Sequence, residues 1–330
     1  MVLAAYFVSA ALLSLAAIAA LLPLLRRSQV LDLPNHRSSH QVPTPRGAGL
    51  ALIPVVALLW SSIAVLEPVT ANVALMWAAA GAVLLCALSW LDDLRSLSPL
   101  LRFGAHIVVI AALLYNVPPD VSYLQGVFPL WVDRLIAGFI WLWFINLFNF
   151  MDGIDGISGV ETGAVAAGLI AIAVTVPAFW PIGLPAAVLA GAACGFLVLN
   201  WHPAKIFLGD SGSIPLGLLL GWLLLQLAAA GHWAAALILP LYYLADATIT
   251  ISRRLLRGEK IWQAHRQHFY QRAVAGGASH SRVSLMIALA NFLLIVCALV
   301  SIITPWPALA AAVLIVFALL TVLKSRAPAP

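Results

Sequence analysis

The chain carries little charge: only 9% of its 330 residues are Asp, Glu, Lys or Arg. Soluble domains carry roughly 25% of these residues, whereas 63% of this chain is hydrophobic. A water-soluble fold has nowhere to bury that much apolar surface. The composition therefore excludes soluble globular proteins, collagens, coiled coils and disordered chains. We expect a polytopic membrane protein.

Cysteine is also scarce. Cys86, Cys194 and Cys297 lie far apart, each inside an apolar run. This spacing excludes a disulfide scaffold and a cysteine metal site. We expect the three residues to pack inside membrane spans.

Uncharged segments predict an all-α fold with about eleven transmembrane helices, because about 20 helical residues cross the hydrocarbon core. The predicted spans lie at 2–25, 47–66, 68–91, 103–119 and 135–151, and as pairs within 162–204, 211–245 and 283–323. The pairs are expected to divide near Pro177, at Gly231 and at Pro305. No internal repeat or linker is visible, so residues 1–330 are interpreted as a single integral membrane domain.

The basic residues orient these spans. All but Arg134 of the 17 Lys and Arg residues fall on one side if the first helix runs from outside to inside. Because positive loops stay in the cytoplasm, this predicts a periplasmic N-terminus. The net charge of +5 is then explained by topology, and nucleic acid is not an expected partner. No basic segment precedes the first helix, so a cleaved signal peptide is not expected.

Three acidic motifs lie on this predicted cytoplasmic face. They are LDDLRSLSP with Asp92 and Asp93, NLFNFMDGIDGIS with Asn149, Asp152 and Asp155, and FLGDSGS with Asp210. Carboxylates at a membrane edge are costly unless something positive compensates them. Oxygen donors without His or Cys clusters suit Mg²⁺ or Mn²⁺ on a phosphate. The motifs therefore indicate metal-assisted phosphate chemistry.

Two further segments on the same face contain cations and imidazoles. Residues 32–49 contain Arg37, His40 and Arg46, and residues 253–282 contain Arg266 and His268 among aromatic residues such as Trp262. We expect Arg266 and His268 to contact phosphate. His106 is expected to pack within its span, and adjacent Asp92 and Asp93 to face different partners, because they diverge by about 100° on a helix.

Taken in order, these motifs resemble the polyprenyl-phosphate N-acetylhexosamine-1-phosphate transferases (glycosyltransferase family 4), which include the WecA and WbpL branch and MraY. The resemblance covers the first loop, DD, NxxNxxDGxDG, GDSGS and a histidine loop. It implies transfer of a hexosamine 1-phosphate from a UDP-sugar to undecaprenyl phosphate, with UMP released. It also implies Mg²⁺, with Mn²⁺ as a substitute, a cytoplasmic active site in the bacterial inner membrane, and a product that initiates O-antigen or another surface polysaccharide.

The resemblance also implies roles for individual residues. Asp210 looks like the principal metal ligand, with Asn149 as the second. Asp92 and Asp93 match the catalytic carboxylate pair, and both a base role and an orienting role are open. The implied substrate contacts are Asp152, Asp155 at the uridine-contacting position, Asn200, Arg46, Arg102, His265, Arg266 and His268. Membrane lipids are expected partners, and a homodimer is left open.

One departure concerns the loop AHRQHFYQR, where Tyr270 and Gln271 stand at positions that hold further histidines in WecA-like members. The MraY histidine cluster is absent too, which favours a WbpL-like enzyme over a muramyl-pentapeptide transferase. The alternatives are an intramembrane aspartyl protease and a polytopic transporter. The protease would use the Gly-Asp pair at 209–210 and Asp246, an acid inside an apolar run, but it leaves the DD, NxxN and DGxDG motifs unexplained. A transporter usually places ionisable groups near the middle of the membrane, where Asp246 is the one candidate.

Overall fold

The computed structural model describes residues 1–34, 39, 42–67, 73–95, 97–118, 120–260 and 265–327. The described helices are α1 (Val2–Arg27), α2 (Gly49–Leu66), α3 (Val73–Arg95), α4 (Pro99–Tyr115), α5 (Leu130–Phe150), α6 (Ile157–Thr175), the 3₁₀ turn η1 (Pro177–Phe179), α7 (Trp180–Asn200), α8 (Asp210–Ala229), α9 (Trp233–Ile238), α10 (Leu241–Leu256), α11 (Phe269–Ala275), α12 (His280–Ser301) and α13 (Pro305–Ser325). Two short strands, β1 (Leu31–Asp32) and β2 (Thr44–Pro45), pair antiparallel in the first loop. Arg37, His40 and Trp262 lie outside the described residues.

The predicted all-α membrane fold is confirmed. Among the described residues, nine helices are long and apolar enough to cross a membrane: α1, α2, α3, α5, α6, α7 with η1, α8, α12 and α13. Helix α4 is apolar but has only 17 residues. The predicted divisions of the long apolar segments are found after α6, α8 and α12. The span after α8 is itself broken into α9 and α10 at Pro240, whose ring nitrogen has no hydrogen to donate.

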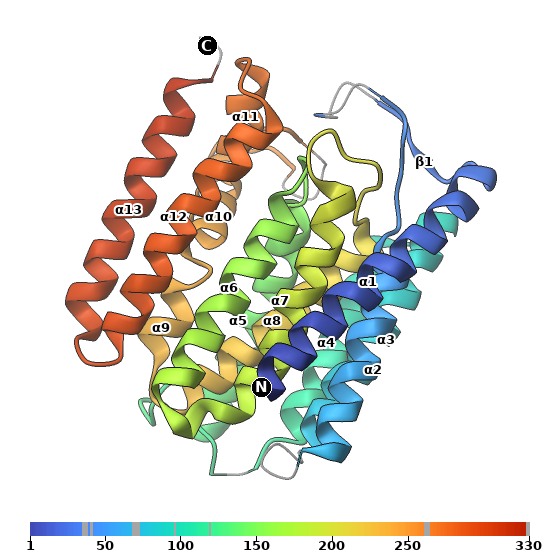
Figure 1. The fold of residues 1–330 in the computed structure, drawn as a ribbon. Helices are drawn as coiled ribbons and strands as arrows, with labels where there is room; N and C mark the ends of the chain where they lie inside the picture. Colours follow the sequence, from blue (N-terminus) through green and yellow to red (C-terminus); the bar gives the residue numbers. More distant parts are fainter. Residues whose placement is uncertain are drawn as a thin grey trace.

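The connections that carry the acidic motifs gather at one end of the bundle, which we call the motif end. Figure 1 shows the first loop, the α7–α8 connection and α11 at this end, while the α12–α13 connection lies at the opposite end. Segments far apart in sequence are therefore neighbours here.

A close approach of two backbones aligns the first loop with the start of α8. A Cβ atom on Gly49 would overlap the backbone of Gly212, so the first turns of α2 and α8 touch directly. The amides of Gly47 and Gly49 donate to the carbonyls of Phe207 (3.1 Å) and Leu208 (3.1 Å). Amides at a helix start have no partner within their own helix, so these bonds satisfy the start of α2.

Candidate active site

A cavity of about 410 Å³ opens at the motif end. It is formed by the first loop, the end of α5, the α5–α6 and α7–α8 connections, the start of α8, and α11. The predicted site residues that line it are Arg46, Asn149, Asp152, Asp155, Asn200, Asp210 and His265. Parts of the first loop, the NxxNxxDGxDG motif, the GDSGS motif and the histidine loop thus converge on one cavity, whereas the predicted site residues Asp92, Asp93, Arg102, Arg266 and His268 do not line it.

Arg46 and Asp210 are placed by the backbone pairing between the first loop and the α7–α8 connection. Phe207 donates its amide to the carbonyl of Pro45 at 2.8 Å, next to Arg46. Gly209 adopts a positive φ of 74°, which a side chain would disfavour, and turns the chain into α8. Asp210 is the first residue of that helix, and its side chain is 36% exposed. A carboxylate in a first helical turn also benefits from the helix dipole.

Asp92 and Asp93 lie in the last turn of α3 and face different partners. Asp92 accepts hydrogen bonds from the Leu97 amide (2.7 Å) and the Arg102 guanidinium (2.7 Å). Asp93 pairs with Arg46 at 3.1 Å, while its Oδ2 atom is buried without a hydrogen-bond partner. Arg102 also lies 3.9 Å from Asp210. Two arginines therefore connect the carboxylate pair to the cavity.

Asn149 and Asp152 come from the end of α5 and the turn that follows it. The Ser213 hydroxyl on α8 donates to the side-chain oxygen of Asn149, and the Ser158 hydroxyl donates to Asp152 at 2.7 Å. Burial raises the pKa of Asp152 to about 7, and the negative charge of Asp210 adds to this effect. The turn is tightly packed, since a Cβ atom on Gly153 would overlap the Tyr270 hydroxyl.

These residues fit a hard divalent cation. The carboxylates of Asp152 and Asp210 and the amide of Asn149 all line the same cavity. Oxygen donors of this kind are the ligands that Mg²⁺ and Mn²⁺ prefer. Burial is the main cause of the raised pKa of Asp152, and the negative charge of Asp210 adds to it; a bound cation would favour the ionised form of both carboxylates.

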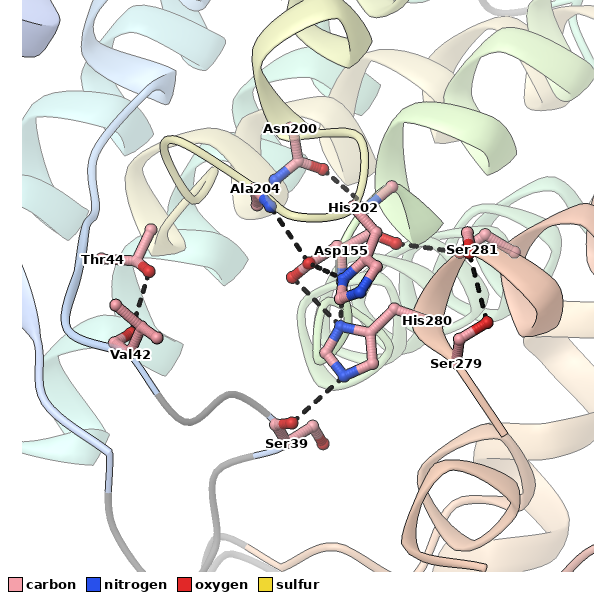
Figure 2. A network of polar contacts seen from close by, with 12 residues as sticks. Ser39, Val42, Thr44, Asp155, Asn200, His202, Ala204, Ser279, His280 and Ser281 are labelled. Carbon is pink, nitrogen blue, oxygen red and sulfur yellow. Dashed lines mark hydrogen bonds and ion pairs between the residues drawn. The ribbon is translucent and has the colours of Figure 1, made fainter. Parts of the chain in front are cut away.

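Asp155, three residues after Asp152, lies in a polar cluster of its own (Figure 2). Its Oδ2 atom contacts His202 Nδ1 at 2.6 Å and accepts from the Ala204 amide at 3.1 Å, and its Oδ1 lies 3.1 Å from His280 Nδ1. Burial alone would raise the pKa of Asp155, but the contacts with His280 and His202 hold it below its usual value. Asn200 completes the cluster by accepting from the Gly156 amide at 2.8 Å.

The histidine loop divides into residues at the cavity and residues away from it. His265 lines the cavity, and burial lowers its pKa to about 4. Arg266 is exposed and does not line the cavity. His268 is 1% exposed and packs behind the cavity, with Nδ1 3.1 Å from Asp246. Asp246 also accepts from the Phe269 amide at 3.1 Å, so it fixes the start of α11 to α10.

Several lining residues have no role predicted from sequence, among them Asp32, Gln271 and His280. Gln271 stands at a position noted above as a departure from the histidine pattern. Its side-chain oxygen accepts from the His268 amide at 3.3 Å, and its amide nitrogen lies next to Gly153. His280 is the first residue of α12, whose N-cap is Ser279, and it belongs to none of the motifs recognised in the sequence.

Known proteins resemble the chain over this same region. A family model described as glycosyl transferase family 4 matches residues 75–228. A probable undecaprenyl-phosphate N-acetylglucosaminyl 1-phosphate transferase of Bacillus subtilis (strain 168) is 31% identical over 311 residues, which cover 89% of this chain and 84% of the relative. The chain belongs to glycosyl transferase family 4.

Two further relatives have different names. A decaprenyl-phosphate N-acetylglucosaminephosphotransferase of Mycolicibacterium smegmatis is 31% identical, covering 78% of this chain and 71% of the relative. A phospho-N-acetylmuramoyl-pentapeptide-transferase of Microcystis aeruginosa is 32% identical, covering 62% of this chain and 60% of the relative. Family 4 membership confirms the resemblance inferred from the motifs and makes the chain a membrane-bound transferase. The matched residues run from α3 to α8 and include Asp92 and Asp210.

Proposed function

We propose that the chain transfers an N-acetylhexosamine 1-phosphate from a UDP-sugar to undecaprenyl phosphate, releasing UMP. The observation that carries this proposal is one cavity where oxygen donors and the Arg46 guanidinium group meet at the ends of membrane helices in a family 4 chain. The names of the Bacillus and Mycolicibacterium relatives support N-acetylglucosamine as the sugar. The basic residues at the motif end support a cytoplasmic face in an inner membrane. The lipid-linked product would initiate a surface polysaccharide such as O-antigen.

Arg46 and Arg102 are the groups placed to hold phosphate. Asp93 and Asp92 fix these two guanidinium groups, at 3.1 Å and 2.7 Å respectively. A guanidinium presents several donors in one plane and so suits phosphate oxygens. Asp210 and Asn149 would hold Mg²⁺, or Mn²⁺ in its place, which neutralises the diphosphate so that a second phosphate can approach.

The hydrogen bonds of Asp92 and Asp93 support different roles for the two carboxylates. The second pKa of a phosphate monoester is about 6, so the lipid phosphate is mostly dianionic near pH 7 and needs no base. Both oxygens of Asp92 already accept hydrogen bonds, which fits an orienting role toward Arg102. Asp93 keeps one oxygen without a partner, so any proton taken up by the pair would go to Asp93.

A second cavity supports a place for the prenyl chain. Its volume is about 230 Å³, and it lies between α5, α8, α9 and α10. The lining is almost entirely apolar and includes Ile140, Trp141, Phe144 and Leu244. Phe144 lies on α5, the helix whose last turn contains Asn149. An apolar chain held there would lead toward the first cavity along α5.

The contacts of Asp246 argue against the protease and transporter alternatives, which both need this carboxylate. Asp246 is 0% exposed and is engaged by Tyr242, Thr250, His268 and the first amides of α11. A carboxylate engaged in this way serves to hold the histidine loop.

UMP release by purified protein tests the proposal. The assay combines undecaprenyl phosphate, a panel of UDP-N-acetylhexosamines, and either Mg²⁺ or EDTA. We expect release that requires lipid, metal and Asp210, with Asp210→Asn inactive and the exposed Asp120→Asn unchanged. No release with any donor, or release without lipid, would overturn the proposal.

A further inference from the structure

Two imidazoles flank Asp155, and the proposed transfer uses neither of them. His202 lies in the α7–α8 connection and His280 is the first residue of α12, whereas Asp155 lies between α5 and α6. Figure 2 shows both rings beside the Asp155 carboxylate. One nitrogen of each ring and one carboxylate oxygen all lie within 4.8 Å of one another. Three separate segments thus deliver three ligand atoms to one point.

The contacts of His280 show which of its nitrogens is the hydrogen-bond acceptor. Its Nε2 atom lies 3.1 Å from the carbonyl of Ser39, and because a carbonyl only accepts, Nε2 carries the hydrogen. In the neutral ring Nδ1 is then an acceptor, and it receives the Asp155 amide at 3.3 Å. The same Nδ1 lies 3.1 Å from Asp155 Oδ1. Two acceptors this close need a positive charge between them, either a second proton on the ring or a metal ion.

A carbonyl that fixes the far nitrogen is the usual companion of a metal-binding histidine. Such a ring donates its second N–H to a carbonyl or carboxylate, which leaves the other nitrogen for the metal. The Ser39 carbonyl supplies this contact for His280. We propose that Asp155, His202 and His280 form a site for Zn²⁺ or a similar borderline divalent cation, separate from the oxygen-rich Mg²⁺ site.

The chemistry of the ligands selects the ion. Imidazole nitrogens suit Zn²⁺, Co²⁺ and Ni²⁺, whereas Mg²⁺ prefers oxygen ligands. A Zn²⁺ ion takes nitrogen and oxygen ligands at about 2.0–2.2 Å, usually four of them. Asp155 also lines the 410 Å³ cavity, so water can supply a fourth ligand.

The exposure of the three side chains fits two buried ligands and one that an ion can reach from solvent. The side chains of Asp155 and His280 are 6% and 8% exposed. The His202 side chain is 39% exposed, so its ring is open to solvent. On binding, the hydrogen of the His202 ring moves from Nδ1 to Nε2 by exchange with water, so that the ring stays neutral and the Nδ1 lone pair goes to the metal.

A metal ion bound at Asp155, His202 and His280 would also affect the proposed sugar-phosphate transfer. The metal would engage carboxylate oxygens of Asp155, the residue that the family resemblance implies for uridine. This consequence rests on the proposed function, whereas the metal site itself does not. The test therefore measures metal binding without turnover.

A chelator competition measures Zn²⁺ binding to the full-length protein in detergent, without a histidine tag and with excess Mg²⁺. We expect one Zn²⁺ per chain in the unmodified protein. His202→Ala should weaken the affinity at least tenfold, because it removes a ligand. His232→Ala, which removes an imidazole in the α8–α9 connection, is the matched control and should bind as the unmodified protein does.

Two further measurements protect the test from a folding artefact. Asp155→Asn keeps the size of the side chain but removes its charge, and it should weaken Zn²⁺ binding as His202→Ala does. Co²⁺ in place of Zn²⁺ should give the intense visible band of a four-coordinate ion in the unmodified protein and lose it in both variants. Equal Zn²⁺ affinity in the unmodified protein and His202→Ala would overturn the proposal.

Discussion

Asp246 and Asp210 are both carboxylates in a membrane protein, but their surroundings differ. Asp246 is 0% exposed and accepts from the amides of Phe269 and Tyr270 and from two hydroxyl groups. The Asp210 side chain is 36% exposed at the cavity, with Arg102 at 3.9 Å. The difference indicates that buried and cavity carboxylates have different roles in this protein. A fully bonded carboxylate fixes a loop, and an incompletely bonded one is left for a ligand.

Asp133 extends the comparison to the opposite end of the bundle. It is 0% exposed and accepts from the Ser122 hydroxyl (2.9 Å) and from the amides of Tyr123 (2.9 Å) and Leu124 (2.7 Å). It thus fixes the connection before α5 as Asp246 fixes the start of α11. We therefore expect changes at cavity acids to affect activity and changes at bonded acids to affect stability.

The largest expected effect on activity belongs to Asp210→Asn. This change removes a charged metal ligand while keeping the shape of the side chain. We expect UMP release to fall by about 1000-fold, equivalent to about 4 kcal/mol of lost transition-state stabilisation. The thermal midpoint should hold or rise, because repulsion with Asp152 is relieved. If Asp210→Asn instead lost much stability and kept its activity, Asp210 would be a structural acid like Asp246, and the distinction between the two would be wrong.

Asp246→Asn should lower both the stability and the activity of the protein. The buried amide keeps the shape of the side chain but cannot accept every hydrogen bond that the carboxylate accepts. Hydrogen bonds to charged groups contribute roughly 1.5–3 kcal/mol each, so the thermal midpoint should fall by several degrees. We expect activity to fall about tenfold, because the loop with His265 loses its anchor.

Asp133→Asn is the matched control for this loop effect. It should lower the thermal midpoint in a similar way but leave the rate of UMP release unchanged. Thermal unfolding and activity, measured on the same samples, separate the two cases. Equal loss of activity in both variants would show that general destabilisation, rather than the histidine loop, accounts for the Asp246→Asn result.

Asp152→Asn should have a smaller effect, which is a change in how the thermal stability depends on pH. Burial, with the charge of Asp210 added, raises its pKa to about 7, against about 4 for an unfolded chain. Between these values the folded protein holds a proton that the unfolded chain has lost. Stability from this group therefore falls as pH rises from about 4 to about 7 and then levels off. In EDTA, the fall in thermal midpoint from pH 5 to pH 8 should be smaller in Asp152→Asn, and an equal fall would contradict the assignment.

The fold could be predicted largely from composition and proline positions. Apolar runs of 20 residues have few alternatives to membrane helices, and the breaks after α6, α8 and α12 follow from Pro and Gly. The break at Pro240 was missed, because prolines at positions such as Pro185 and Pro215 are tolerated inside helices here. Sequence alone does not say which proline interrupts a span.

The site was predictable where function depends on a motif and unpredictable where it depends on distant contacts. Asp210 and Asn149 stand in patterned segments, so their shared cavity follows once the loops are placed on one face. The contact of His280 with Asp155 depends on how the start of α12 packs against the α5–α6 connection. No local pattern encodes that packing. For the same reason, His268 could not be separated from His265 by sequence.

The smallest expected effect belongs to Arg266, and it distinguishes an exposed residue of the histidine loop from one that lines the cavity. Arg266 is exposed and away from the cavity lining, whereas His265 lines the cavity. We expect Arg266→Ala to change the KM for the UDP-sugar by less than about threefold, because an exposed cation adds little to binding in salt. His265→Ala should change it by about tenfold through a lost hydrogen bond. If Arg266→Ala has the larger effect, the loop closes over the substrate on binding, and Arg266 contacts phosphate as its sequence context predicts.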